Sequence, residues 1–297
     1  MDAGERATTA AAEAALRQYL GTPFLVESRA VPVVLAALTV GLMAMWGVRR
    51  SGRWWVGACV ALAYATSVEV LVRSSYGGYF AVSQLSVLLT VWVVHRSVRP
   101  SWAVTAWGAW VMGADHKSVL LPIGLAAVQL QRPAVRRFVV GALVGTLGFW
   151  LWGMLLAPDA FMADHVFAHL LDRVRQHNPL GYSGYPDVVS LWRELARHVG
   201  PVLPIGLVLV VLRRHVRPWS VWVLLTALVF SVVDWRMTKH LMPLVLVAHM
   251  ALVPQRGDAR PWWRFVAGVL VLQVFWNGEQ LVTLIDSFEA IRVTPGW

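Results

Sequence analysis

The residues best suited to chemistry lie in three ionisable clusters next to apolar segments. In the most compact, Asp115-His116-Lys117 forms the whole turn between two short apolar runs. Three ionisable groups in such a setting are unfavourable unless they are paired or bind a ligand. The Lys117 ammonium could bind a phosphate, and the Asp115 carboxylate could accept a proton or bind a metal. The alternative is a polar turn closed by an Asp–Lys ion pair.

The second cluster, Asp234-Trp235-Arg236 with Lys239-His240, directly precedes an apolar run that starts with Leu241-Met242-Pro243. Two cations at the start of a membrane span would suit a lipid-linked phosphate or pyrophosphate. The alternative is that Arg236 and Lys239 extend to lipid headgroups without a bound substrate.

The third cluster contains Glu69 and Arg73, one helical turn apart, followed by Ser74-Ser75-Tyr76. An ion pair along the helix would explain Glu69 and Arg73, and a role in a site is the alternative. Tyr182 and Tyr185, in a Gly- and Pro-rich segment, are candidate substrate contacts.

Residues 158–200 form the one long stretch without a membrane span. Within it, 161–176 separates into an apolar and a polar side, which predicts an amphipathic helix lying in the membrane interface. His165, His169 and Asp172 share the polar side at i, i+4 and i+7, a spacing that could ligate a divalent metal. A solvated polar face is the alternative. A second short helix is expected over 187–198.

The elements that must position these residues are apolar. The chain has 297 residues, 58% of them hydrophobic and only 14% charged, which excludes a disordered chain and a soluble nucleic-acid-binding domain. We expect about ten transmembrane helices, because there are ten apolar runs: 31–48, 54–72, 79–95, 101–114, 118–130, 138–157, 201–213, 218–234, 240–254 and 263–281. The runs 101–114 and 118–130 are short enough to be half-length helices.

The connections alternate in charge. More than half of the 26 lysines and arginines lie in five short connections, as Arg49, Arg50, Arg53, Arg96, Arg99, Arg132, Arg136, Arg137, Arg213, Arg214, Arg217, Arg256, Arg260 and Arg264. Nearly all of the acids lie in the other connections. The positive-inside rule places the arginine-rich set in the cytoplasm and both chain ends outside. The net charge of +10 is therefore mostly a topology signal, and we expect no nucleic-acid partner.

The predicted fold is an all-α, polytopic membrane protein with an interfacial amphipathic helix in one large outer loop. We expect an outer N-terminal tail over 1–30, a transmembrane domain over 31–281 that includes the outer segment 158–200, and an outer C-terminal tail over 282–297.

Taken in order, these motifs resemble polytopic glycosyltransferases of the GT-C fold, which include protein O-mannosyltransferases and the lipid A aminoarabinose transferase. The resemblance covers most of residues 31–254. It rests on the stretch from Val72-Arg73-Ser74-Ser75-Tyr76 to Gln84-Leu85, on Asp115-His116-Lys117 before Leu120-Leu121-Pro122, on the helix at 161–176, and on Arg236 with Lys239-His240-Leu241-Met242-Pro243-Leu244.

The resemblance implies transfer of a sugar from a polyprenyl-phosphate donor to a lipid, glycan or protein acceptor on the outer face. Asp115 and His116 would be the catalytic residues. Lys117, Arg73, Arg236, Lys239, His240, Tyr182 and Tyr185 would contact substrate, with Lys117, Arg236 and Lys239 at the donor phosphate. The one candidate cofactor is a divalent metal, with His165, His169 and Asp172 as its candidate ligands. The family's first span and first acidic loop have no counterpart here. Two alternatives would explain this: the start site has been placed too late, or the protein is a non-catalytic, truncated relative of the family.

A transporter or flippase of a lipid-linked or small polar substrate is the competing hypothesis. It predicts internal repeats and charges at mid-membrane, whereas the charges here gather at one rim. The expected location is the bacterial inner membrane, as part of the machinery of the cell envelope.

Overall fold

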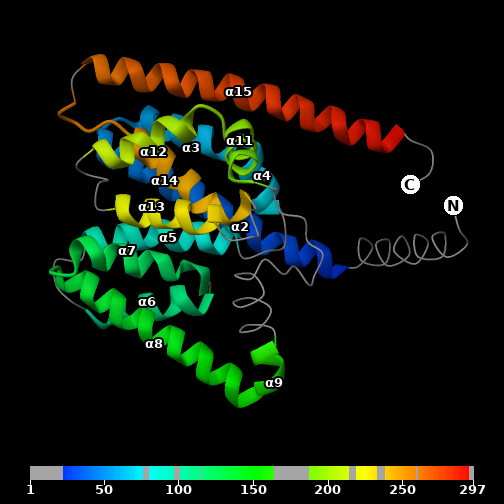
Figure 1. Cartoon of the computed structure of the whole chain (residues 1–297). Coiled ribbons are helices and arrows are strands. Elements are labelled where there is room, and N and C mark those ends of the chain that lie inside the picture. Colours follow the sequence, from blue (N-terminus) through cyan, green and yellow to red (C-terminus); the bar gives the residue numbers. More distant parts are fainter. Residues whose placement is uncertain are drawn as a thin grey trace, which may run out of the picture.

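The computed structural model describes residues 23–75, 80–96, 101–114, 116–163, 187–213, 219–232, 238–258 and 260–293. Within these ranges the chain is helical and has no strand, which confirms the all-α prediction (Figure 1). The elements are α2 (Pro23–Ser51), α3 (Trp54–Ala65), α4 (Val68–Ser75), α5 (Phe80–Arg96), α6 (Trp102–Ala114), η1 (His116–Val119), α7 (Leu120–Gln129), α8 (Pro133–Leu156), α9 (Pro158–Phe161), α11 (Val188–Val199), α12 (Val202–Leu212), α13 (Ser220–Val232), η4 (Thr238–Leu241), α14 (Met242–Leu252) and α15 (Arg260–Val293).

Three of these helices contain segments long and apolar enough to cross a membrane, namely Val31–Ser51, Pro133–Leu156 and Arg260–Thr283. A fourth candidate joins α11 and α12 across a bend of 103°. Large apolar side chains on α8 and α15 are exposed, among them Leu155 at 78% and Phe275 at 74%. Such surfaces are stable in lipid rather than in water, so the chain has the features of a membrane protein.

The described helices coincide with most of the expected apolar runs, but only the segments named above are long enough to cross a membrane, so the expected count of ten spans is not confirmed. The bounds of the helices differ from the expected runs in three places. The short runs 101–114 and 118–130 are indeed the half-length helices α6 and α7. The run 54–72, expected to be one span, is broken between α3 and α4. The Leu62 carbonyl accepts both the Thr66 amide at 2.9 Å and the Thr66 hydroxyl at 2.8 Å, so this hydroxyl helps to end α3.

The two ends of the expected transmembrane domain also differ. Helix α2 begins at Pro23, within the expected N-terminal tail, and proline is favoured in the first turn of a helix. Helix α15 continues to Val293 and so includes most of the expected C-terminal tail. At the start of the outer segment, α9 is a single turn, and residues 164–186 of the expected interfacial helix and loop lie outside the described residues.

Close helix packing holds the bundle together. Helices α6 and α8 approach so closely that a Cβ at Gly141 would lie 1.9 Å from the Thr105 carbonyl oxygen, and one at Gly145 would lie 2.4 Å from that of Ala109. Small residues four apart allow this backbone approach in membrane helices. Helix α14 is buried along its length and packs against α12, α5 and α3 in the centre.

The arginine-rich connections meet at one end of the bundle. The Arg49 guanidinium lies 4.6 Å from the ring of Trp92 on α5, and Arg53 lies 4.6 Å from that of Trp263 on α15. Arg132, after α7, donates to the Val94 carbonyl of α5 at 3.3 Å. The predicted sorting of charge is thus present in three dimensions, and we call this the arginine-rich end.

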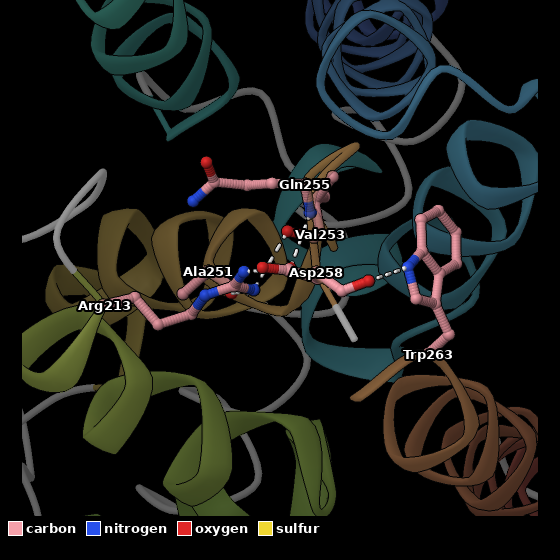
Figure 2. Close-up of polar contacts among 6 residues, drawn as sticks. All are labelled: Arg213, Ala251, Val253, Gln255, Asp258 and Trp263. Atoms are coloured by element: carbon pink, nitrogen blue, oxygen red, sulfur yellow. Dashed lines mark hydrogen bonds and ion pairs between the residues drawn. The ribbon is translucent and has the colours of Figure 1, made fainter. Parts of the chain in front are cut away.

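An ion pair between Arg213 and Asp258 closes this end (Figure 2). Arg213 also donates to the Val253 carbonyl at 3.1 Å. The Asp258 carboxylate accepts a hydrogen bond from the backbone N–H of Gln255 at 2.7 Å. The backbone carbonyl of Asp258 accepts one from the Trp263 indole N–H at 3.2 Å. One aspartate therefore connects the ends of α12 and α14 to the start of α15.

Candidate functional site

The opposite, acid-rich end contains a buried carboxylate. Glu69, in the first turn of the short helix α4, is only 3% exposed. Its Oε2 atom lies 3.3 Å from Nδ1 of His198, in the last turn of α11. A carboxylate this buried is stable when a partner compensates its charge, and a protonated His198 would do so.

Helix α11 brings His198 to this position because one of its faces is apolar. Leu191, Leu195 and Val199 are fully buried, whereas Glu194 and His198 lie one turn apart on another face. The His198 Nε2 atom is 3.6 Å from Glu194 Oε2, so each ring nitrogen lies near a carboxylate.

The start of α11 is fixed by a cap. The Asp187 carboxylate accepts the Ser190 amide at 2.8 Å and the Ser190 hydroxyl at 2.7 Å. These hydrogen bonds, the backbone one foremost, lower the pKa of Asp187. The expected second helix over 187–198 is confirmed, with Asp187 as its N-cap.

The pair is accessible from one side only. The His198 side chain is 32% exposed and that of Glu69 is 4% exposed. A partly exposed histidine beside a shielded carboxylate is an arrangement that general acid–base chemistry can use.

Two polar residues of α15 hold both helix breaks that border the pair. Gln273 donates to the Val199 carbonyl and accepts the Val202 amide at 3.0 Å, across the bend between α11 and α12. Asn277 donates to the Ala63 carbonyl at 2.9 Å and to the Thr66 hydroxyl at 2.8 Å, at the break after α3. Gln273 also donates to the Asn277 side chain at 2.7 Å. The elements that carry Glu69 and His198 are thus positioned by one face of α15.

The two lysine-bearing turns begin two short apolar helices. His116 and Lys117 lie in the 3-10 turn η1, directly before α7. Lys239 and His240 lie in the 3-10 turn η4, directly before α14, and η4 contacts α11. His240 is buried, and its ring stacks on that of Phe230 at 5.2 Å.

The structure places the backbone of several predicted site residues but not their side chains. This holds for Arg73, which lies in α4 one turn after Glu69, and for His116, Lys117 and Lys239. The other predicted residues lie outside the described ranges: Asp115, His165, His169, Asp172, Tyr182, Tyr185 and Arg236. Their roles remain predictions. Among the described residues no group of three His, Cys, Asp or Glu side chains could hold a metal ion.

The sequence interpretation did not include the pairing of Glu69 with His198. It explained Glu69 by Arg73, its neighbour along the helix, and gave His198 no role. The available signal was the combination of a carboxylate inside an apolar run with a Glu194–His198 spacing of one turn on an amphipathic helix.

The chain matches no protein-family model, and no curated protein or solved structure is significantly similar to it.

Proposed function

We propose that this protein is a membrane glycosyltransferase that moves a sugar from a polyprenyl-phosphate donor to a lipid, glycan or protein acceptor on the extracytoplasmic face. The observation that carries the proposal is the placement of η1 and η4. Each is a single 3-10 turn with a lysine, and each begins a short apolar helix. Helix α7 ends at the arginine-rich end, where Arg132 donates to Gln129 at 2.9 Å, so η1 lies at the end of α7 that points away from the arginine-rich end. Because η4 contacts α11, which carries His198, this turn lies toward the Glu69–His198 pair.

The proposed topology has about ten transmembrane helices, with the arginine-rich end in the cytoplasm of a bacterial cell and the acid-rich end facing out. Helices α6 and α7 would together cross only part of the bilayer, with η1 between them. The donor lipid could then reach η1 and η4 from the surrounding membrane.

In the proposed reaction, an acceptor hydroxyl oxygen attacks the anomeric carbon and loses its proton to a general base, for which the Asp115 carboxylate and the His116 imidazole are the first candidates. The bond from the anomeric carbon to the phosphate oxygen breaks, and polyprenyl phosphate leaves with the bonding electrons. Lys117, Arg236 and Lys239 would stabilise the charge that develops on this phosphate. Arg73, His240, Tyr182 and Tyr185 would contact the substrate, and the Glu69–His198 pair is a second candidate acid–base group.

The test uses the full chain in liposomes with three probes, the polyprenyl phosphates of mannose, glucose and aminoarabinose. The experiment measures how much polyprenyl phosphate is released when a fraction that contains acceptor molecules is added. Lys117→Ala and Arg236→Ala are each expected to reduce release about 100-fold, as when one charge-stabilising donor is removed. Arg193→Ala, a matched exposed arginine on α11, should leave release unchanged.

Full activity in both variants would overturn the assignment of Lys117 and Arg236 to the phosphate. A reporter fused after Trp297 should lie outside the cytoplasm. A cytoplasmic signal would overturn the proposed topology.

A transporter or flippase is the second candidate, because two helix breaks are held by buried amides. Discontinuous helices with buried polar partners commonly form transporter sites. This candidate predicts that a polyprenyl-phosphate sugar crosses the liposome membrane with its glycosidic bond intact. Release of polyprenyl phosphate would contradict it.

A further inference from the structure

A basic pocket lies at the arginine-rich end, on the opposite side from the proposed transferase site. It has a volume of about 740 Å³ and is lined by residues of three segments: Ser51, Gly52, Arg53, Arg256, Asp258, Arg260, Trp263 and Arg264. The segments are the turn from α2 to α3, the loop after α14 and the start of α15. The pocket thus lies where the described part of the chain changes direction twice.

The pocket has an excess of positive charge. Asp258 is its one acidic lining residue, and that carboxylate is already paired with Arg213 from outside the lining (Figure 2). Arg53, Arg256, Arg260 and Arg264 are all exposed, and none forms an ion pair with any residue in the described ranges. Four guanidinium groups around one cavity repel each other, and a bound anion would offset this repulsion.

Two features position Arg53 and Arg256 before a ligand arrives. The Arg53 guanidinium lies 4.6 Å from the Trp263 ring, whose indole donates to the Asp258 carbonyl. Gly52 has φ +74°, and a Cβ there would lie 2.8 Å from Nε of Arg256. Glycine therefore both permits the turn and leaves room for the Arg256 side chain.

The surroundings favour a lipid as the source of the anion. The pocket lies at the ends of α2 and α15, two helices with segments long and apolar enough to cross a membrane. Exposed apolar side chains adjoin it, namely Val48 at 37%, Phe265 at 45% and Trp54 at 76%. We propose that the pocket binds the phosphate of an anionic phospholipid headgroup, whose acyl chains lie along the apolar surfaces of α2 and α15. Guanidinium groups suit phosphate because they donate two parallel hydrogen bonds.

The test is native mass spectrometry of the full chain in detergent, titrated with dioleoylphosphatidylglycerol. The double variant Arg256→Gln/Arg260→Gln should weaken lipid binding about 100-fold, roughly tenfold for each guanidinium that no longer bonds the phosphate. The matched control Arg136→Gln/Arg137→Gln removes the same charge from residues on α8 outside this pocket, and should change binding less than about threefold. Equal weakening in both would mean general attraction to a basic end and would overturn the pocket.

Two further arms identify the source of the phosphate. Dioleoylphosphatidylcholine, which has no net charge, should bind far more weakly than the anionic lipid. Soluble glycerol 3-phosphate should compete only weakly, because it lacks acyl chains, and equal affinity would overturn the assignment to a lipid. The single variant Arg264→Gln, which removes only one charge, should weaken lipid binding about tenfold and keeps the test decisive if the double variant does not fold.

Discussion

The two ends of the bundle use charge in different ways. At the arginine-rich end, cations lie at the surface and are held by tryptophan rings and backbone carbonyls, as for Arg53 and Arg132. At the acid-rich end, the described charges are few, but Glu69 is buried beside His198. The number of charged groups therefore indicates orientation in the membrane, whereas their burial indicates where chemistry is favourable.

One ion pair at the arginine-rich end departs from this contrast and gives the largest expected effect. The Arg213 and Asp258 side chains are only 11% and 23% exposed. Asp258→Asn should therefore lower the free energy of unfolding by about 2 kcal/mol, between the values for exposed and buried pairs. Thermal unfolding in detergent measures this, with Asp286→Asn, an exposed acid of α15, as the control. Equal destabilisation in the two variants would show that the Asp258 pair adds nothing specific.

The second prediction sharpens the contrast at the acid-rich end. In a double-mutant cycle with Glu69→Gln and His198→Gln, we expect a coupling energy of about 1 kcal/mol, because the two side chains lie in direct contact. The same unfolding measurement applies. A parallel cycle with Glu194→Gln should give a smaller coupling, since that side chain is 29% exposed. If both couplings are zero, Glu69 behaves like a surface acid despite its burial.

An effect of similar size is expected for an arginine that fixes one connection. Arg132→Gln removes the hydrogen bonds to the Val94 carbonyl and the Gln129 side chain and should destabilise the protein by about 1 kcal/mol. Arg136→Gln, at an exposed position on α8, should have almost no effect. If the two variants are equally stable, the hydrogen bonds of Arg132 do not contribute to stability.

The smallest effect concerns pH and the start of α11. Folding lowers the pKa of Asp187 from its ordinary value of 3.8. The ionised side chain therefore stabilises the folded state at pH values above 3.8, and this stabilisation is lost as the pH falls through the lowered pKa. Asp187→Asn keeps a capping side chain without this titration. The stability difference between wild type and variant should therefore shrink from about pH 6 to about pH 3. If this stability difference does not change with pH, the charge of Asp187 does not contribute to stability.

Sequence patterns were sufficient where local signals decide the structure. The short helices α6 and α7 follow from charged and proline-bearing boundaries, and the sorted arginines follow from the positive-inside rule. The break between α3 and α4 was missed because Thr66 and Ser67 are only weakly polar. The partner that stabilises this break, Asn277, is 211 residues away. The Glu69–His198 pairing was missed for the same reason, since it depends on how α4 and α11 pack.

The bend between α11 and α12 has a mechanical consequence. Gly200 permits the turn because its φ is +84°. The angle between α11 and α12 is fixed from α15, because Gln273 forms hydrogen bonds with Val199 and Val202 on the two sides of Gly200. A rotation of α15 by one residue, about 100°, would move Gln273 away from both bonds. The orientation of the surface helix α11 therefore reports the rotation of α15, and a spectroscopic distance label on each helix would measure whether they turn together.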